Sequence, residues 1–211
     1  MCQGFWECQV SGQIAVWLTA FGTIGVVFYA LTSEWWQAKF FGPVLELSFE
    51  DDPAYITRTW ESVSGSNEPV CVAFYVRVKV QNRRKAVAKK CQAYLINVEK
   101  FDKNQNTFKP TIYCDSIRLS WSCQPTLDSG YKALDLPNKV NQFVDVVATR
   151  SNHPFFEMQL NPSMNRYASL FIENGIFQFT ILVTGNRVTP KKIKIIFEWS
   201  GVWDKFKAYK G

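Results

Sequence analysis

Few residues of this chain have the types and spacing that enzyme chemistry needs. His153 is the only histidine among the 211 residues, so a triad of nucleophile, histidine and acid would have to use it. The sequence contains neither a G-x-S-x-G elbow nor a phosphate-binding P-loop, and its carboxylates show no evident acid–base pair. We therefore predict a protein that is not an enzyme, with no catalytic residues and no cofactor.

The cysteines do not have the spacing of a metal site. They occupy positions 2, 8, 71, 91, 114 and 123, and none form a C-x-x-C pair. Zinc sites usually draw on such pairs or on several histidines, so we predict no bound metal. A bridge between Cys114 and Cys123 stays open if the domain lies outside the cell, whereas a cytoplasmic domain would keep its cysteines as thiols.

One run of basic residues suggests a binding mechanism. Arg77 to Lys90 contains seven Lys or Arg and no acidic residue. The expected lipid contacts are Arg83, Arg84, Lys85, Lys89 and Lys90. Each Lys or Arg near an anionic bilayer surface contributes about 1 kcal/mol of attraction. The alternative is a solvated hairpin loop that is basic by chance.

These cations would meet lipid if the chain were held at a membrane, and the N-terminal part offers a candidate anchor. Ile14 to Leu31 is a run of eighteen residues without a charge. About twenty helical residues cross roughly 30 Å of hydrocarbon, so we predict a tail at 1–12, a transmembrane helix at 13–33 and a linker at 34–42. The aromatic residues expected at the membrane interfaces are Trp17, Tyr29, Trp35 and Trp36.

A cleaved signal peptide is the main alternative to an anchor. The first thirteen residues contain no Lys or Arg, and no A-x-A pattern follows the apolar run, so the sequence favours an anchor. From residue 43 onward the chain has 23 basic and 16 acidic residues. The positive-inside rule then predicts a single-pass protein of the cell membrane with its β-domain in the cytoplasm.

The chain beyond the anchor has the pattern of short strands. The strongest predicted strand is Val70 to Gln81, in which Phe74 to Gln81 alternates apolar and polar residues, as a half-exposed strand does. Further strands are expected at 44–49, 91–101, 117–121, 132–136, 142–148, 167–172, 175–183 and 192–199. We predict an all-β fold, an antiparallel immunoglobulin-like β-sandwich over 43–203, followed by a basic C-terminal tail at 204–211.

Two segments resemble the signature strands of prokaryotic immunoglobulin-like domains. Residues 75–95, YVRVKVQNRRKAVAKKCQAYL, are similar to a strand ending in V-x-N-x-G, an alanine and a second strand. Residues 175–183, GIFQFTILV, are similar to a late G-x-Y-x-F-x-I-x-V strand. Such patterns occur in the CARDB-like group, and the layout resembles prokaryotic single-pass membrane proteins with such a domain. Arg84 stands where the pattern has glycine, and the resemblance implies a fold and an anchor but no activity.

These features predict a membrane-anchored binding or scaffolding module whose partners are the lipid bilayer and an unidentified protein. Nucleic acid, another common partner of basic domains, is not the expected one. The first alternative is a regulatory or defence-type membrane component that senses a ligand or partner and forms homo-oligomers through its helix. Small residues that permit close helix pairing are Thr19, Ala20, Gly22, Thr23 and Gly25. The second alternative, an anchored hydrolase, lacks the expected catalytic groups.

Overall fold

The structure is a computed structural model that describes residues 5–36, 42–62, 69–123, 131–153, 155–158, 160–161 and 167–211. The chain divides into two compact units, residues 1–42 and residues 43–211.

The first unit contains one helix, α1 (Phe5–Trp36). Its side chains are described without a break over 16–30, and all of these are exposed. Trp17 is 64% exposed and Tyr29 is 68% exposed, whereas the side chains of Trp35 and Trp36 lie outside the described residues.

The predicted transmembrane helix at 13–33 is not found in the part of the chain that the structure describes. No helix there combines the length and the apolar character needed to cross a membrane.

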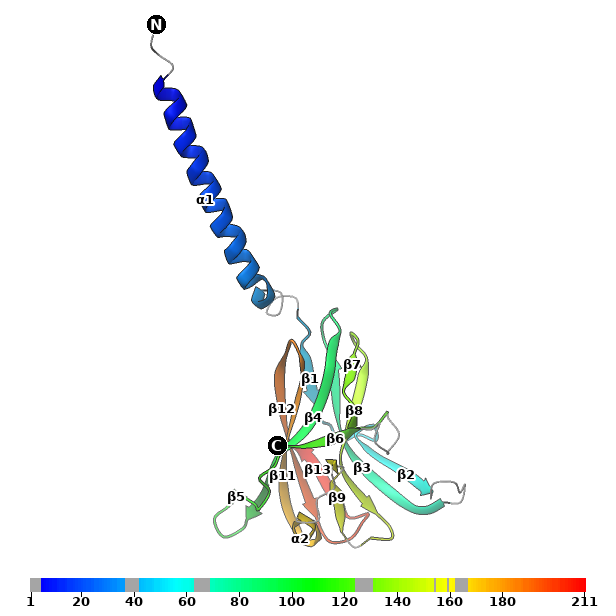
Figure 1. The fold of residues 1–211 in the computed structure, drawn as a ribbon. Helices are drawn as coiled ribbons and strands as arrows, with labels where there is room; N and C mark the ends of the chain where they lie inside the picture. The colour runs from blue at the N-terminus through cyan, green and yellow to red at the C-terminus, as the bar shows by residue number, and fades with distance from the viewer. Residues whose placement is uncertain are drawn as a thin grey trace. The chain divides into compact units, whose positions relative to one another are not determined.

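The second unit is a β-domain, and Figure 1 shows its strands. They are β1 (Leu45–Ser48), β2 (Ile56–Ser62), β3 (Pro69–Asn82), β4 (Ala88–Asp102), β5 (Thr107–Pro110), β6 (Ile117–Trp121), β7 (Leu134–Leu136), β8 (Asn141–Arg150), β9 (Phe156–Met158), β10 (Leu160–Asn161), β11 (Gly175–Asn186), β12 (Val188–Trp199) and β13 (Phe206–Lys210). One short helix, α2 (Ala168–Ile172), precedes β11.

The described strands form one sheet in the order β1-β3-β8-β6-β4-β11-β12-β13, and the paired strands are antiparallel. β6 belongs to two halves of this sheet, because Arg118 pairs with Tyr94 of β4 and Trp121 pairs with Val144 of β8. β1 also lies beside β12, so the sheet is strongly curled into a half-barrel. The expected antiparallel β fold is confirmed, but the expected pair of separate sheets is replaced by one curled sheet because β6 joins both halves.

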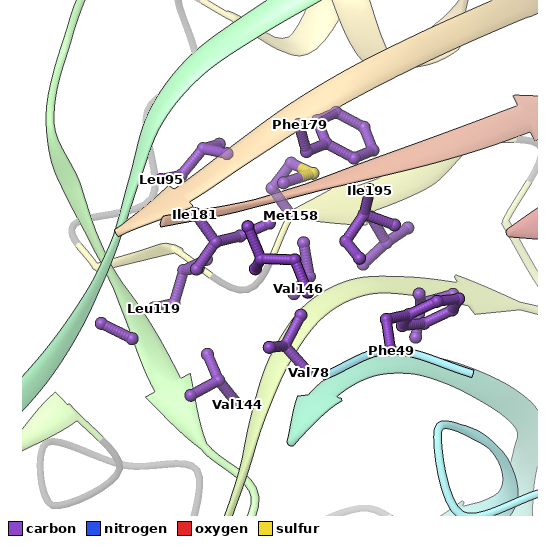
Figure 2. Packing of buried hydrophobic residues seen from close by; sticks show 14 of the residues in the cluster. Phe49, Val78, Leu95, Leu119, Val144, Val146, Met158, Phe179, Ile181 and Ile195 are labelled. Atoms are coloured by element: carbon purple, nitrogen blue, oxygen red, sulfur yellow. The ribbon is translucent and has the colours of Figure 1, made fainter. Parts of the chain in front are cut away.

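The hydrophobic core fills the inside of the curl. Val76, Val78 and Val80 of β3 are completely buried, as their alternation with polar residues predicts. Figure 2 shows Val78 within a cluster that also includes Leu95 of β4 and Ile195 of β12. Side chains from both halves of the sheet therefore share one core.

Phe156 of β9 lies at the centre of an aromatic cluster in this core. Its ring is completely buried. The ring centroids of Phe171, Phe177, Phe179, Phe197 and Trp199 lie between 5.1 and 6.3 Å from that of Phe156. Rings at these distances and at tilted or edge-on angles attract one another beyond the effect of their burial. The cluster holds the short strand β9 and helix α2 against β11 and β12.

Two segments differ from the sequence prediction in type. A strand was expected at 167–172, but residues 168–172 form α2, because Tyr167, Leu170 and Phe171 are buried at the i, i+3, i+4 spacing of one helix face. A basic tail was expected at 204–211, but Phe206–Lys210 forms β13 and pairs with β12. The segment looks basic because it contains Lys205, Lys207 and Lys210. The short alternation that buries Ala208 is therefore not evident from the sequence.

Besides β13, four of the described strands were not expected: β2, β5, β9 and β10. β5, β9 and β10 contain between two and four residues, too few for an alternation to stand out. β2 is polar along most of its length, and its pairing with β3 places Thr57 opposite Tyr75 and Thr59 opposite Ala73.

Candidate functional site at the basic end of the β-domain

Three connections meet at the end of the β-domain where β1 begins. Leu45 at the start of β1 lies opposite Asn82 at the end of β3, and the Arg83 N–H donates to the Val44 carbonyl at 2.8 Å. Lys89, near the start of β4, lies opposite Asn186 at the end of β11. We name this region the basic end and define it as residues 83–90, 137–140 and 185–188.

The buried side chain of Asn82 ties these connections together. Its Nδ2 donates to the carbonyl oxygens of Ala86 at 2.6 Å and Leu136 at 3.1 Å, and its Oδ1 accepts from the Arg84 N–H at 3.1 Å. The Lys139 N–H donates to the Asn82 carbonyl at 2.9 Å. A buried amide that is satisfied in this way fixes the loops around it. Arg84 is not among the residues with positive φ, so the turn needs no glycine at that position.

The structure brings all five predicted lipid contacts to the basic end. Arg83, Lys85, Lys89 and Lys90 are exposed, and Arg84 is half-buried. Arg83 forms an ion pair with Glu46, and the Asp135 carboxylate accepts the Lys90 N–H at 2.8 Å.

Two further cations at this end were missed by sequence reasoning. Lys139 comes from the connection between β7 and β8, and Arg187 comes from the turn between β11 and β12. Both are exposed. The strands expected at 175–183 and 192–199 imply a hairpin turn between them. Arg187 lies in that turn, so its place at this end of the domain could have been predicted. No local signal links Lys139 to the basic run, because the Asn82–Asn138 bridge is a contact between distant segments.

Three cations of the basic end have a backbone conformation that favours glycine. φ is +51° at Lys90, +59° at Lys139 and +55° at Arg187. Asn106 is the other non-glycine residue with positive φ among the described residues. A side chain in this left-handed region costs on the order of 1 kcal/mol. The chain therefore has cations at three positions where glycine would be less strained.

The basic end also exposes apolar side chains. Val87, in the connection between β3 and β4, is 43% exposed, and Val140, just before β8, is 39% exposed. Surfaces that lie on a bilayer combine apolar side chains, which enter the boundary of the acyl region, with Lys and Arg at the headgroups. The basic end has both components.

The histidine lies in a different place, a polar cluster on the face of the sheet opposite the core. Arg150 of β8 donates from Nε and Nη2 to the carboxylate of Glu61 at 2.7 and 3.1 Å, and from Nη1 to Glu157 of β9. His153 Nδ1 lies 3.0 Å from Glu157 Oε1. Both carboxylates are thus held by one guanidinium, and the cluster cross-links β2, β8 and β9.

Burial and hydrogen bonding set the pKa values in this cluster. Burial by itself would raise the pKa of Glu61, but hydrogen bonds from Arg150 and Tyr75 outweigh it, and the pKa is lowered. Burial, and then the hydrogen bond to Glu61, raises the pKa of Tyr75 well above its ordinary value. Glu61 is therefore held as a carboxylate and Tyr75 as a neutral phenol.

The four described cysteines are free thiols with contrasting environments. Cys71 and Cys91 are buried, and Cys114 and Cys123 are exposed. Burial raises the pKa of the Cys91 thiol to about 11 and also raises that of Cys71. A cysteine reacts as its thiolate, and only where the reagent can reach the sulfur.

We expect a maleimide reagent to modify Cys114 and Cys123 in the native protein and to reach Cys71 and Cys91 only after unfolding. Peptide mapping by mass spectrometry, with and without urea, checks each position separately. Native modification of Cys91 as fast as that of Cys123 would contradict this expectation.

Comparisons of the chain with protein-family models, with curated protein sequences and with solved structures give no match. A function is therefore inferred from the residues and geometry of this chain itself.

Proposed function

We propose that this protein is a membrane-associated binding module that holds its β-domain against anionic lipid through the basic end. The observation that carries the proposal is the convergence of seven cations from three connections, three of them in a left-handed backbone conformation. These cations are Arg83, Arg84, Lys85, Lys89, Lys90, Lys139 and Arg187. Glu46 pairs with Arg83, and the Asp135 carboxylate accepts the backbone N–H of Lys90.

The apolar surface of α1 supports attachment to a membrane. Val16, Leu18 and Phe21 are each about two thirds exposed, and the described side chains on all sides of the helix lie open. Such a surface is unfavourable in water and favourable against lipid. Anionic lipids give the cytoplasmic leaflet its negative surface potential, so we place the β-domain on the cytoplasmic side.

The β-domain itself is proposed to be related to immunoglobulin-like domains. The two halves of the curled sheet that share β6 would correspond to the two sheets of such a sandwich. The loops of such domains are common binding surfaces, and here the loops of one end carry the charge. A protein partner and the absence of catalytic activity stay predictions.

Nucleic acid is the other polyanion that a basic surface attracts. The exposed Val87 and Val140 favour lipid, because apolar side chains gain nothing from a phosphate backbone and are stabilised in the boundary of the acyl region. Binding to duplex DNA is therefore one outcome to be tested.

We expect residues 43–211 to sediment with vesicles that contain phosphatidylserine and not with neutral phosphatidylcholine vesicles. The double variant Lys85→Gln, Lys89→Gln is expected to bind anionic vesicles about 30-fold more weakly, at about 1 kcal/mol per charge. The matched control removes two exposed arginines elsewhere on the domain, Arg58→Gln and Arg118→Gln, and should bind nearly as tightly as the unaltered domain. Circular dichroism establishes beforehand that each variant keeps its strand content.

Three results would overturn the lipid contact. They are equal binding to neutral and anionic vesicles, equal loss in the control and in the test variant, and tighter binding to duplex DNA than to anionic vesicles at the same salt concentration. Added salt should weaken the vesicle binding because it screens exposed charges.

The alternative of a regulatory or defence-type component that oligomerises through its helix stays a prediction. Gly22 and Gly25 leave open space at the surface of α1, where a second helix could approach closely. Crosslinking of the full chain in a bilayer would distinguish an oligomer from a monomer.

A further inference from the structure

A cleft of about 640 Å³ lies at the end of the β-domain opposite the basic end. It forms where β4 and β12 end and where β11 and β13 begin. β4 starts and β11 finishes at the basic end, so the cleft is separated from it by the length of these strands. Its volume falls in the range of about 300–1,000 Å³ that is typical of small-molecule sites.

The charged residues that line this cleft are mainly cationic. Its lysines are Lys100, Lys103, Lys205 and Lys207, and its carboxylate is Glu198. Glu198 accepts a hydrogen bond from the Tyr209 hydroxyl at 2.8 Å. Lys100 is paired with Glu173, while the other three lysines are exposed. The cleft therefore has an excess of positive charge available to a ligand.

The remaining surface of the cleft is largely apolar and is fixed by packing. Its large apolar side chains are Phe101, Ile176, Trp199 and Phe206. Trp199 is 3% exposed and contacts the ring of Phe156, and the ring centroid of Phe206 lies 5.4 Å from that of Phe197. Phe101, Ile176 and Phe206 are half-buried, so their accessible parts form the apolar surface of the cleft, with Trp199 packed beneath it.

The turn after β12 also shapes the cleft. Gly201 has φ of +86°, and a Cβ at this position would lie 2.6 Å from Asn174 Oδ1. Glycine is required there both by the backbone conformation and by the close approach. It allows the turn to pack against Asn174, which lines the cleft beside Ser200.

A neighbouring cleft of about 570 Å³ provides an internal comparison. It shares Lys100, Phe101 and Lys103 with the first cleft. Its further lysine, Lys109, is paired with Asp102 at 2.6 Å, and it also contains Glu173. The cations of the second cleft are thus largely neutralised, so an anion is attracted to the first.

We propose that the first cleft binds a small amphipathic anion, with an apolar ring or short chain on the aromatic surface and a phosphate or carboxylate among the lysines. Lys103, Lys205 and Lys207 supply the charge, and Phe101 and Phe206 supply the apolar contact. This binding is separate from the lipid contact of the basic end. If that contact forms, the cleft faces away from the bilayer and its ligand comes from solution.

Titration calorimetry of the full chain in neutral phosphatidylcholine nanodiscs tests this site, with empty nanodiscs as the reference. The probe is 1-naphthyl phosphate, which has both an apolar ring and a phosphate. We expect saturable binding with one site per chain. Inorganic phosphate and 1-naphthol, which each lack one part, should bind at least tenfold more weakly. Equal affinity for 1-naphthol would overturn the role of the lysines, and equal affinity for inorganic phosphate would overturn the role of the apolar surface.

The double variant Lys103→Gln, Lys207→Gln should weaken 1-naphthyl phosphate binding at least tenfold. The matched control, Arg58→Gln with Arg118→Gln, removes two exposed arginines that belong neither to the cleft nor to the basic end and should leave it unchanged. Undiminished binding by the first variant, or an equal loss in both, would refute the proposal. The two single variants, checked by circular dichroism, distinguish lost charge from lost folding. The lipid contact is tested with variants at other residues. A failure of the lipid proposal would therefore not change the interpretation of the 1-naphthyl phosphate experiment.

Discussion

The variant Phe156→Ala is expected to lower the free energy of unfolding of the β-domain by about 3–5 kcal/mol. Phe156 is completely buried, and its ring contacts five other aromatic rings from α2, β11 and β12. Its removal loses both the buried apolar area and the edge-on ring contacts. The large rings around the cavity cannot close it, because each is held by its own strand or helix.

Urea unfolding followed by circular dichroism measures this change, with the unaltered protein as reference. The matched control is Phe155→Ala, one residue earlier in the chain. Phe155 is half-buried and stacks on His153 with ring centroids 5.1 Å apart, so its loss should cost about 1 kcal/mol or less. Similar losses in the two variants would contradict the central place of Phe156 in the core.

The variant Arg150→Met is expected to destabilise the β-domain by about 3 kcal/mol at neutral pH. The Arg150 side chain is 15% exposed and bonds to two carboxylates, Glu61 and Glu157. Methionine preserves much of the apolar stem but leaves two partly buried negative charges without their common cation. Arg118→Met, an exposed arginine on β6, is the matched control and should change stability little.

The loss in Arg150→Met is expected to shrink as the pH falls. In the unaltered protein the pKa of Glu61 is lowered on folding, so its contribution is present above the ordinary glutamate pKa and is lost as the pH falls through the folded value. Without Arg150 the burial of Glu61 raises its pKa instead, and protonation near the ordinary glutamate range relieves the repulsion. Urea unfolding at neutral pH and at about pH 4.5 checks this. If the difference in unfolding free energy between the unaltered protein and Arg150→Met grows on acidification, the assigned role of Arg150 is refuted.

The longer strands could be predicted because their pattern is local. In β3 and β11 every second side chain is apolar, and this alternation alone assigns Val78 and Ile181 to the core. The same reasoning failed for Tyr167–Ile172, where a run of six residues fits either a strand or a single helical turn and a half. In the helical form the ring of Phe171 packs against the ring of Phe156, a tertiary contact that the local sequence does not indicate.

Part of the candidate site could also be read from the chain. Arg83 to Lys90 are close in sequence, so their common location on a connection between two strands was predictable. Lys139 and Arg187 join them only through strand register: Asn138 meets Asn82, and Asn186 meets Lys89. The left-handed conformations at Lys90, Lys139 and Arg187 follow from those turns and have no sequence signal comparable to glycine.

The sequence by itself determined a strand-rich domain, its core-facing positions and a basic connection, because alternation and charge runs are properties of neighbouring residues. The tertiary structure decided the curl of the sheet, the convergence of three basic connections and the lysine-lined cleft. These features depend on which distant strands pair, on the shared strand β6 and on the twist that accumulates across the sheet. The cleft shows this most clearly, since the ends of four strands meet there. Lys100 and Lys103 lie at the end of β4, and Lys205 and Lys207 lie at the start of β13, which the sequence pattern did not predict as a strand.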